Sequence, residues 1–85
     1  MNILMIRKYI SKMTLDDVKN MALKQGIILD DNEISNVYKY IKSNYNSFFN
    51  GKLSIDQILY DAKELVSSTN YNKFMDLYLK NKDKI

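Results

Sequence analysis

The sequence predicts an all-α fold, a compact bundle of four to five short helices, with residues 1–85 forming a single domain. Three segments place a small polar residue three positions before an acid or amide, at the start of an apolar stripe of helical spacing. Such a pair forms a capping box, in which each side chain accepts a hydrogen bond from the other residue's backbone N–H and starts a helix. The three pairs are Thr14 with Asp17, Asp30 with Glu33, and Ser54 with Gln57.

The composition supports a folded core but offers no covalent or metal reinforcement. Hydrophobic residues make up 46% of the chain, with seven tyrosines and three phenylalanines, which is enough for a globular domain. The chain contains no Cys and no His, so it forms no disulfide and lacks the normal ligands of a structural zinc ion. At 85 residues it lies close to the lower size limit for an unaided core. Stability must therefore come from packed side chains, or from burial against a second copy or another protein.

A first helix is predicted over residues 3–12, because apolar residues recur at spacings of three and four. These residues are Ile3, Ile6, Ile10 and Met13. Arg7, Lys8 and Lys12 lie elsewhere on the helix, and no acid precedes Asp16. A basic amphipathic helix can lie on a membrane surface, but three charges are few for that role, so packing on the core or in a dimer is favoured.

The second and third helices are predicted over 15–25 and 31–44. Gly26 is placed to close the second helix in a left-handed conformation, and the apolar link 27–29 that follows is expected to be buried. The third helix begins after Asp30 and is expected to fray near Asn44, because Asn and Ser are poor helix formers. Phe48 and Phe49 then fold inward from a loop.

The last two helices are predicted over 55–67 and 70–81, joined by a short polar turn over 67–70. The first of them carries a nearly unbroken apolar stripe of Ile55, Ile58, Leu59, Ala62, Leu65 and Val66. The second turns Tyr71, Phe74, Met75 and Tyr78 inward. The charged residues 80–85 are predicted to form a frayed tail.

A candidate interface comes from the apolar residues that these stripes leave over. They are Ile3, Leu4, Ile6, Leu77 and Leu79. Surplus apolar surface of this kind often marks an interaction site. The alternative is that the two terminal helices simply cover each other.

Catalytic, cofactor and metal sites are not predicted. Without His or Cys, general acid–base and thiol chemistry lose their usual groups. The acid pairs at 16–17 and 30–31 are explained by helix capping. An EF-hand register centred on Gly51 would place no carboxylate at a ligand position, so calcium binding is not expected.

The formal charge of +3 is unevenly distributed along the chain. Residues 1–29 carry five Lys or Arg against two acids, residues 30–66 carry four against six, and residues 67–85 carry four against two. The basic ends, together with Lys39, Tyr40 and Lys42, make nucleic-acid binding the alternative function. No segment has the pattern of a signal peptide or the length of a membrane span, so a cytoplasmic location is expected.

A family resemblance covers most of the chain. The cap at Thr14 precedes an amphipathic helix with Ala22, then come Gly26-Ile27, Leu29, a new cap with Glu33, Asn44-Tyr-Asn-Ser-Phe48 and Asn70-Tyr-Asn-Lys-Phe74. This pattern resembles the short proteins of Bacillus-type bacteria labelled domain of unknown function 2624. The run Phe48-Phe49-Asn50-Gly51 departs from that family's more acidic loop. The resemblance implies a cytoplasmic bacterial helical protein and carries over no functional residue.

The sequence therefore predicts a small, non-enzymatic helical module that interacts with a protein partner or with a second copy of itself, with no cofactor and no small-molecule substrate. Nucleic-acid binding is the alternative. Sequence alone does not identify the partner.

Overall fold

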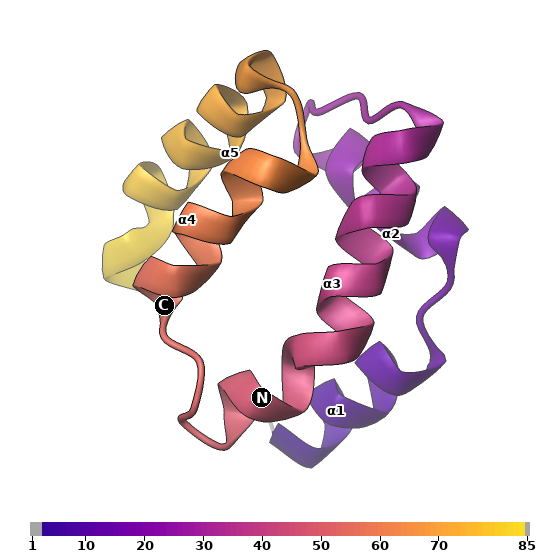
Figure 1. The fold of residues 1–85 in the computed structure, drawn as a ribbon, viewed down its shortest axis with the longest axis vertical. Coiled ribbons are helices and arrows are strands. Elements are labelled where there is room, and N and C mark those ends of the chain that lie inside the picture. Colours follow the sequence, from indigo (N-terminus) through magenta and orange to yellow (C-terminus); the bar gives the residue numbers. More distant parts are fainter. Residues whose placement is uncertain (1–2, 85) are drawn as a thin grey trace.

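The computed structural model describes residues 3–84 and contains five α-helices (Figure 1). They are α1 (Ile3–Lys12), α2 (Leu15–Lys24), α3 (Asp31–Phe49), α4 (Ile55–Leu65) and α5 (Ser68–Asn81), followed by a 3-10 turn, η1 (Lys82–Lys84). No strand occurs among the described residues. The predicted all-α fold is therefore confirmed.

Two of the three predicted capping boxes are complete. The side chains of Thr14 and Asp30 each accept a hydrogen bond from the backbone N–H three residues on. The acids at those positions, Asp17 and Glu33, accept in turn from the backbone N–H of the cap residue. The third pair is only half formed. Ser54 caps α4, but the Gln57 amide donates to Asp61 Oδ1 at 2.8 Å instead of closing the box.

The start of α5 and the end of α3 differ from the prediction. Ser67 caps a helix that begins at Ser68, so the predicted polar turn over 67–70 is the first turn of α5. Helix α3 continues to Phe49 instead of fraying near Asn44. Arg7 of α1 holds this end of α3: its guanidinium donates to Asn50 Oδ1 at 3.0 Å and lies 5.4 Å from the centroid of the Phe49 ring, which itself packs edge to face on Phe48. These tertiary contacts outweigh the low helix propensity of the Asn and Ser residues.

The link between α2 and α3 is only partly buried. Gly26 has the predicted positive φ, at 77°, which lets the chain leave α2. Ile27 is buried and Leu29 is half-buried, but Ile28 is 73% exposed, so the prediction of a fully buried link is wrong. Successive side chains of an extended segment point to opposite sides, which places Ile28 on the solvent side.

The closed part of the core lies between the end of α1, α2 and the first half of α3. Met13, Val18 and Ile34 are buried there, and half-buried residues of α3 surround them. Both α1 and α2 pack against α3, whereas α5 packs against α4. Among the described residues, α4 and α5 contain no fully buried hydrophobic side chain. The molecule thus consists of an α1–α3 group and an α4–α5 pair (Figure 1).

A polar seam joins these two units along one face of α3. Glu33, Asn36 and Tyr40 follow the i, i+3, i+7 spacing of a single helix face. The Asn36 amide donates to the Leu65 carbonyl oxygen at 3.3 Å, and the Tyr40 hydroxyl donates to Asp61 Oδ2 at 2.6 Å. Polar contacts, not apolar packing, therefore attach α4 and α5 to α3 here.

Glu33 forms the buried end of the seam. Its Oε1 accepts from Asp30 N–H at 3.0 Å, and its Oε2 accepts from Ser67 N–H at 2.7 Å. The Asn70 amide donates to both oxygens, at 3.1 and 3.0 Å, and also to the Ile28 carbonyl oxygen at 3.0 Å. Burial raises the pKa of the Glu33 carboxyl, but these hydrogen bonds outweigh it and hold the pKa below the ordinary value of 4.5. One carboxylate thus caps α3 and binds the start of α5.

Replacing Glu33 with Gln should lower the free energy of unfolding by about 1–3 kcal/mol, because an amide NH₂ would face the N–H donors that now bind a carboxylate oxygen. Urea unfolding measures this. Asp76→Asn, at an exposed position of α5, is the control and should change stability by less than about 0.5 kcal/mol.

The stability difference between wild type and Glu33→Gln should depend on pH. Because the folded-state pKa of Glu33 is lowered, its contribution is complete above pH 4.5 and is lost as the pH falls through the folded-state pKa. The stability difference between wild type and Glu33→Gln should therefore shrink in acid. A difference that stays constant or grows would contradict the assigned role of Glu33.

Candidate functional site

Two oppositely charged helix faces are the first candidate site. On α1, Met5, Lys8 and Lys12 follow the i, i+3, i+7 spacing and are all exposed. The third cation of α1, Arg7, is turned inward: it donates to Asn50 Oδ1 at 3.0 Å, and its guanidinium lies 5.4 Å from the centroid of the Phe49 ring. The basic face of α1, defined by Met5, Lys8 and Lys12, therefore presents two lysines beside an exposed apolar side chain.

The second face lies on α4. Asp56, Tyr60 and Glu64 recur every four residues, are all exposed, and define the acidic face of α4. The Lys63 ammonium lies 5.7 Å from the Tyr60 ring centroid and 5.9 Å from that of Tyr71 on α5, so this cation is held between two aromatic rings. Tyr60 is 65% exposed, which leaves much of its ring uncovered between the two carboxylates.

The two faces do not meet within one chain. In the described residues α1 packs on α3 and makes no contact with α4, and Figure 1 places α1 and α4 on opposite sides of the molecule. Each face therefore lacks the oppositely charged surface that the other one offers.

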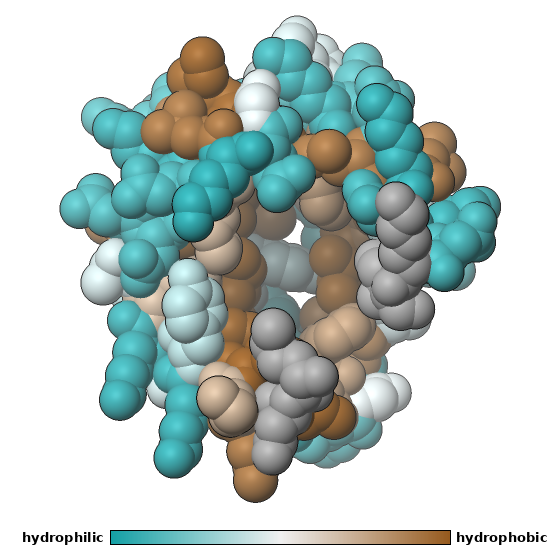
Figure 2. Space-filling view, turned by 180° about the vertical axis from the view of Figure 1, so that it is seen from behind, coloured by the Kyte–Doolittle hydropathy of each residue, from teal (hydrophilic) through white to brown (hydrophobic). Residues whose placement is uncertain are grey.

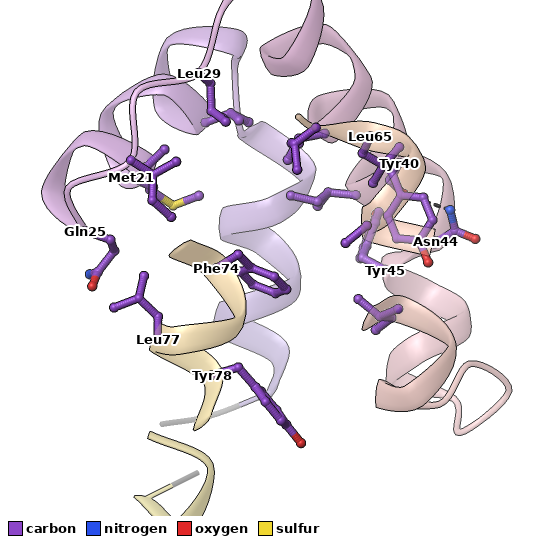
Figure 3. A pocket seen from close by; sticks show the side chains of 18 of the residues that line it. Met21, Gln25, Leu29, Tyr40, Asn44, Tyr45, Leu65, Phe74, Leu77 and Tyr78 are labelled. Atoms are coloured by element: carbon purple, nitrogen blue, oxygen red, sulfur yellow. Dashed lines mark hydrogen bonds between the residues drawn. The ribbon is translucent and has the colours of Figure 1, made fainter. Parts of the chain in front are cut away.

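A hollow between the α1–α3 group and the α4–α5 pair is the second candidate site. Its volume is about 680 Å³, and almost all of its lining atoms are apolar. Figure 2 shows it as a central opening with apolar walls inside a largely hydrophilic surface. Figure 3 shows side chains from several helices, among them Met21, Tyr40, Leu65 and Phe74, directed around one common space.

Part of the core predicted on α4 and α5 lines the hollow instead of being closed off from solvent. The stripe predicted on α4 is present, but Ile58, Ala62, Leu65 and Val66 line the hollow instead of a closed interior. On α5, Phe74 and Tyr78 do the same, and Phe74 is 36% exposed. Periodicity could not distinguish the two cases, because a helical stripe that packs on a core and one that lines an open space have the same spacing.

Several polar side chains at the wall of the hollow have hydrogen-bond partners within the chain. The Tyr40 hydroxyl binds Asp61, the Asn44 amide donates to the Tyr40 carbonyl oxygen at 2.9 Å, and the Asn81 amide donates to the Leu77 carbonyl oxygen at 2.8 Å. Burial, the hydrogen bond to Asp61 and the charge of Asp61 raise the pKa of Tyr40 to about 12. These groups support the walls and do not converge on the space.

The predicted interface residues are spread over the molecule. Ile3 and Leu4 are exposed on α1, and Ile6 is half-buried there. Leu77 lines the hollow, while Leu79 is 53% exposed on α5. Within the described residues the two terminal helices make no contact with each other, so they do not cover each other. The structure thus does not gather these five residues into one surface.

The residues proposed for nucleic-acid contact are mostly engaged within the chain. Lys39 is exposed, but the Lys42 ammonium donates to the Ser11 carbonyl oxygen at 2.6 Å and lies 5.6 Å from the Tyr38 ring centroid. Tyr40 is half-buried and bound to Asp61. These three side chains therefore form no common exposed surface on which a base could stack.

The described part of the chain contains neither a cluster of metal ligands nor a helix suited to span a membrane. Across residues 3–84, no group of three or more His, Cys, Asp or Glu side chains is arranged to hold a metal ion. None of the helices that the structure describes is both long enough and apolar enough to cross a membrane.

Comparison with known proteins gives no family assignment. No family model, curated protein or solved structure matches this chain. The resemblance to domain of unknown function 2624 therefore stays a prediction, and functional inference rests on the geometry of the chain itself.

Replacing Tyr40 with Phe should lower the free energy of unfolding by about 1–2 kcal/mol, because the ring is kept while the hydrogen bond to Asp61 is lost. Thermal or urea unfolding measures the change, and Tyr9→Phe on α1, whose exposed hydroxyl makes only a long contact of 3.8 Å to the Met21 sulfur, is the matched control. Because the pKa of Tyr40 is raised from 10.0 to about 12, its contribution should persist up to pH 10 and be lost as the pH rises toward 12. Equal stability of Tyr40→Phe and wild type at pH 7 would contradict a structural role for this bond.

Proposed function

We propose that this protein is a non-enzymatic interaction module that associates with a second copy of itself. The observation that carries the proposal is the pair of complementary faces, basic on α1 and acidic on α4, which lie apart within one chain. In a two-fold dimer the basic face of each chain packs on the acidic face of the other. Two equivalent contacts then form from a single pair of surfaces.

The spacing of the charges fits such a contact. At a rise of 1.5 Å per residue, Lys8 and Lys12 lie roughly 6 Å apart along α1, and Asp56 and Glu64 roughly 12 Å apart along α4. The flexible lysine side chains can span this difference. Tyr60 lies between the two carboxylates, where its exposed ring can pack against Met5 and against the lysine stems.

The small closed core also favours association. Only Met13, Val18, Ile27 and Ile34 are buried hydrophobic residues in the described part of the chain. A domain of this size without disulfides or metal gains stability from additional buried surface. The exposed apolar residues on both faces, Met5 at 66% and Tyr60 at 65%, supply such surface.

A non-enzymatic role agrees with the way in which the acidic groups are used. Glu33 and Asp61 belong to the polar seam, and Asp17 and Asp30 complete helix caps. These groups are held by hydrogen bonds that serve the fold, and the sequence supplies no His or Cys to act beside them.

Sedimentation tests the proposal. The wild-type chain should show a mass that rises with concentration from the 10.0 kDa of one chain toward twice that value, and added salt should weaken the association. A strict, stable monomer at all concentrations would overturn self-association.

Charge reversal tests the two faces directly. Lys8→Glu with Lys12→Glu, and separately Asp56→Lys with Glu64→Lys, should each weaken association by roughly tenfold or more, because like charges then face each other in both contacts. An equimolar mixture of the two double variants should associate again, since every basic face then meets an acidic one.

Controls with the same change in net charge are available elsewhere on the surface. Lys19→Glu with Lys24→Glu on α2, and Asp76→Lys with Asp83→Lys near the C-terminus, change exposed residues outside both faces. These controls should associate nearly as wild type does. If the mixture fails to associate, or if the controls weaken association as strongly, the assigned faces are wrong even though the chain self-associates.

A further inference from the structure

We propose that the hollow is a binding site for a small, uncharged hydrocarbon, a chain or a ring. This ligand function is separate from self-association, because the acidic face of α4 and the hollow-lining residues lie on opposite sides of that helix. Asp56, Tyr60 and Glu64 form one side, and Ile58, Ala62 and Leu65 face the hollow from the other.

The hollow is too large to be both sealed and empty. A sealed, empty cavity of 680 Å³ would cost on the order of 16 kcal/mol at about 24 cal/mol per Å³. That exceeds the total stability of an ordinary small domain, roughly 5–15 kcal/mol. In the isolated chain the hollow is therefore open to solvent, and its apolar wall is surface that a ligand can cover.

The volume falls in the range of small-molecule sites, about 300–1,000 Å³. At about 680 Å³ the hollow is therefore sized for one small molecule, and its lining determines which chemical class of molecule it takes.

The lining selects an apolar ligand. None of the residues that line the hollow carries a formal charge, and the aromatic and aliphatic side chains of Met21, Phe48, Ile58, Phe74 and Leu77 form much of its wall. Tyr40, Asn44 and Asn81 spend their donors on Asp61 and on backbone carbonyl groups. Gln25, Tyr45 and Tyr78 also line the hollow, but almost all of the atoms exposed in it are apolar. A polar or charged ligand would therefore lose more hydration than the wall can replace, whereas a hydrocarbon loses nothing and gains contact with the wall.

Pyrene is a suitable probe, because it is an uncharged hydrocarbon whose emission bands report the polarity around it. It should bind the folded full chain with one site per chain, with an emission typical of an apolar environment. The measurement is made at a protein concentration too low for association, so that binding to the hollow is separated from any effect of a second copy.

Filling the hollow from its wall should remove binding. Ala62→Phe on α4 should weaken pyrene affinity by roughly tenfold or more and raise the Tm by about 4–8 °C, because the new ring occupies the space and is buried there. Ala22→Phe on α2 tests the opposite wall, and Ala62→Leu is a milder variant if the Phe variant does not fold. Ser43→Phe, at an exposed position of α3, is the matched control and should leave both values unchanged.

Three results would overturn the proposal. If the wild-type protein does not bind pyrene, the hollow is closed in solution. A lowered Tm for both Ala62→Phe and Ala62→Leu would lead to the same conclusion, because a larger side chain destabilises the fold only where no space is left for it. Undiminished binding to Ala62→Phe and Ala22→Phe places the probe elsewhere on the surface. None of these results bears on self-association, which the charge-reversal variants test separately.

Discussion

The polar seam between α3 and the α4–α5 pair is the constraint on which the arrangement of this molecule depends. Glu33, Asn36 and Tyr40 use one face of α3 to bind Ser67 and Asn70, the Leu65 carbonyl group and Asp61. Hydrogen bonds require defined distances and directions, whereas apolar packing is non-directional and favours the closest approach. A contact made of hydrogen bonds can therefore hold two helical units at a fixed separation, and the hollow lies beside this contact.

The seam also decides which surfaces the chain leaves uncovered. Because the α4–α5 pair is attached through Asp61, Leu65 and the start of α5, the opposite side of α4, with Asp56 and Glu64, faces solvent. Helix α1 is held on α3 by the Arg7–Asn50 and Lys42–Ser11 hydrogen bonds, and it cannot reach α4. The separation of basic and acidic faces thus follows from internal bonds, and it makes the chain complementary to a copy of itself.

The sequence predicted features that depend on neighbouring residues and missed those that depend on distant ones. Helix starts at Thr14 and Asp30 and the positive φ of Gly26 follow from local backbone chemistry, so they were predictable. The capping box at the start of α3 predicted that a Glu33 oxygen accepts from the Asp30 N–H. It could not predict that Glu33 also binds Asn70, because Asn70 lies 37 positions further along the chain. Periodicity identified the stripe on α4 and could not show that it lines a hollow. The length of α3 was underestimated because the contacts of Arg7 with Phe49 and Asn50, which support its last turns, join residues more than 40 positions apart.

The buried carboxylate explains why a hollow can persist in so small a domain. Burying Glu33 is costly in itself, yet its oxygens accept from two backbone N–H groups and the Asn70 amide, so the charge is fully compensated. Moving α4 and α5 inward to close the hollow would break the bonds from Ser67 and Asn70 and leave Glu33 Oε2 buried without a partner. The free energy lost with these hydrogen bonds opposes the free energy gained by burying the apolar wall. A hydrocarbon in the hollow covers the same wall while the seam stays intact, and the walls of the site are then held in place by groups that never touch the ligand.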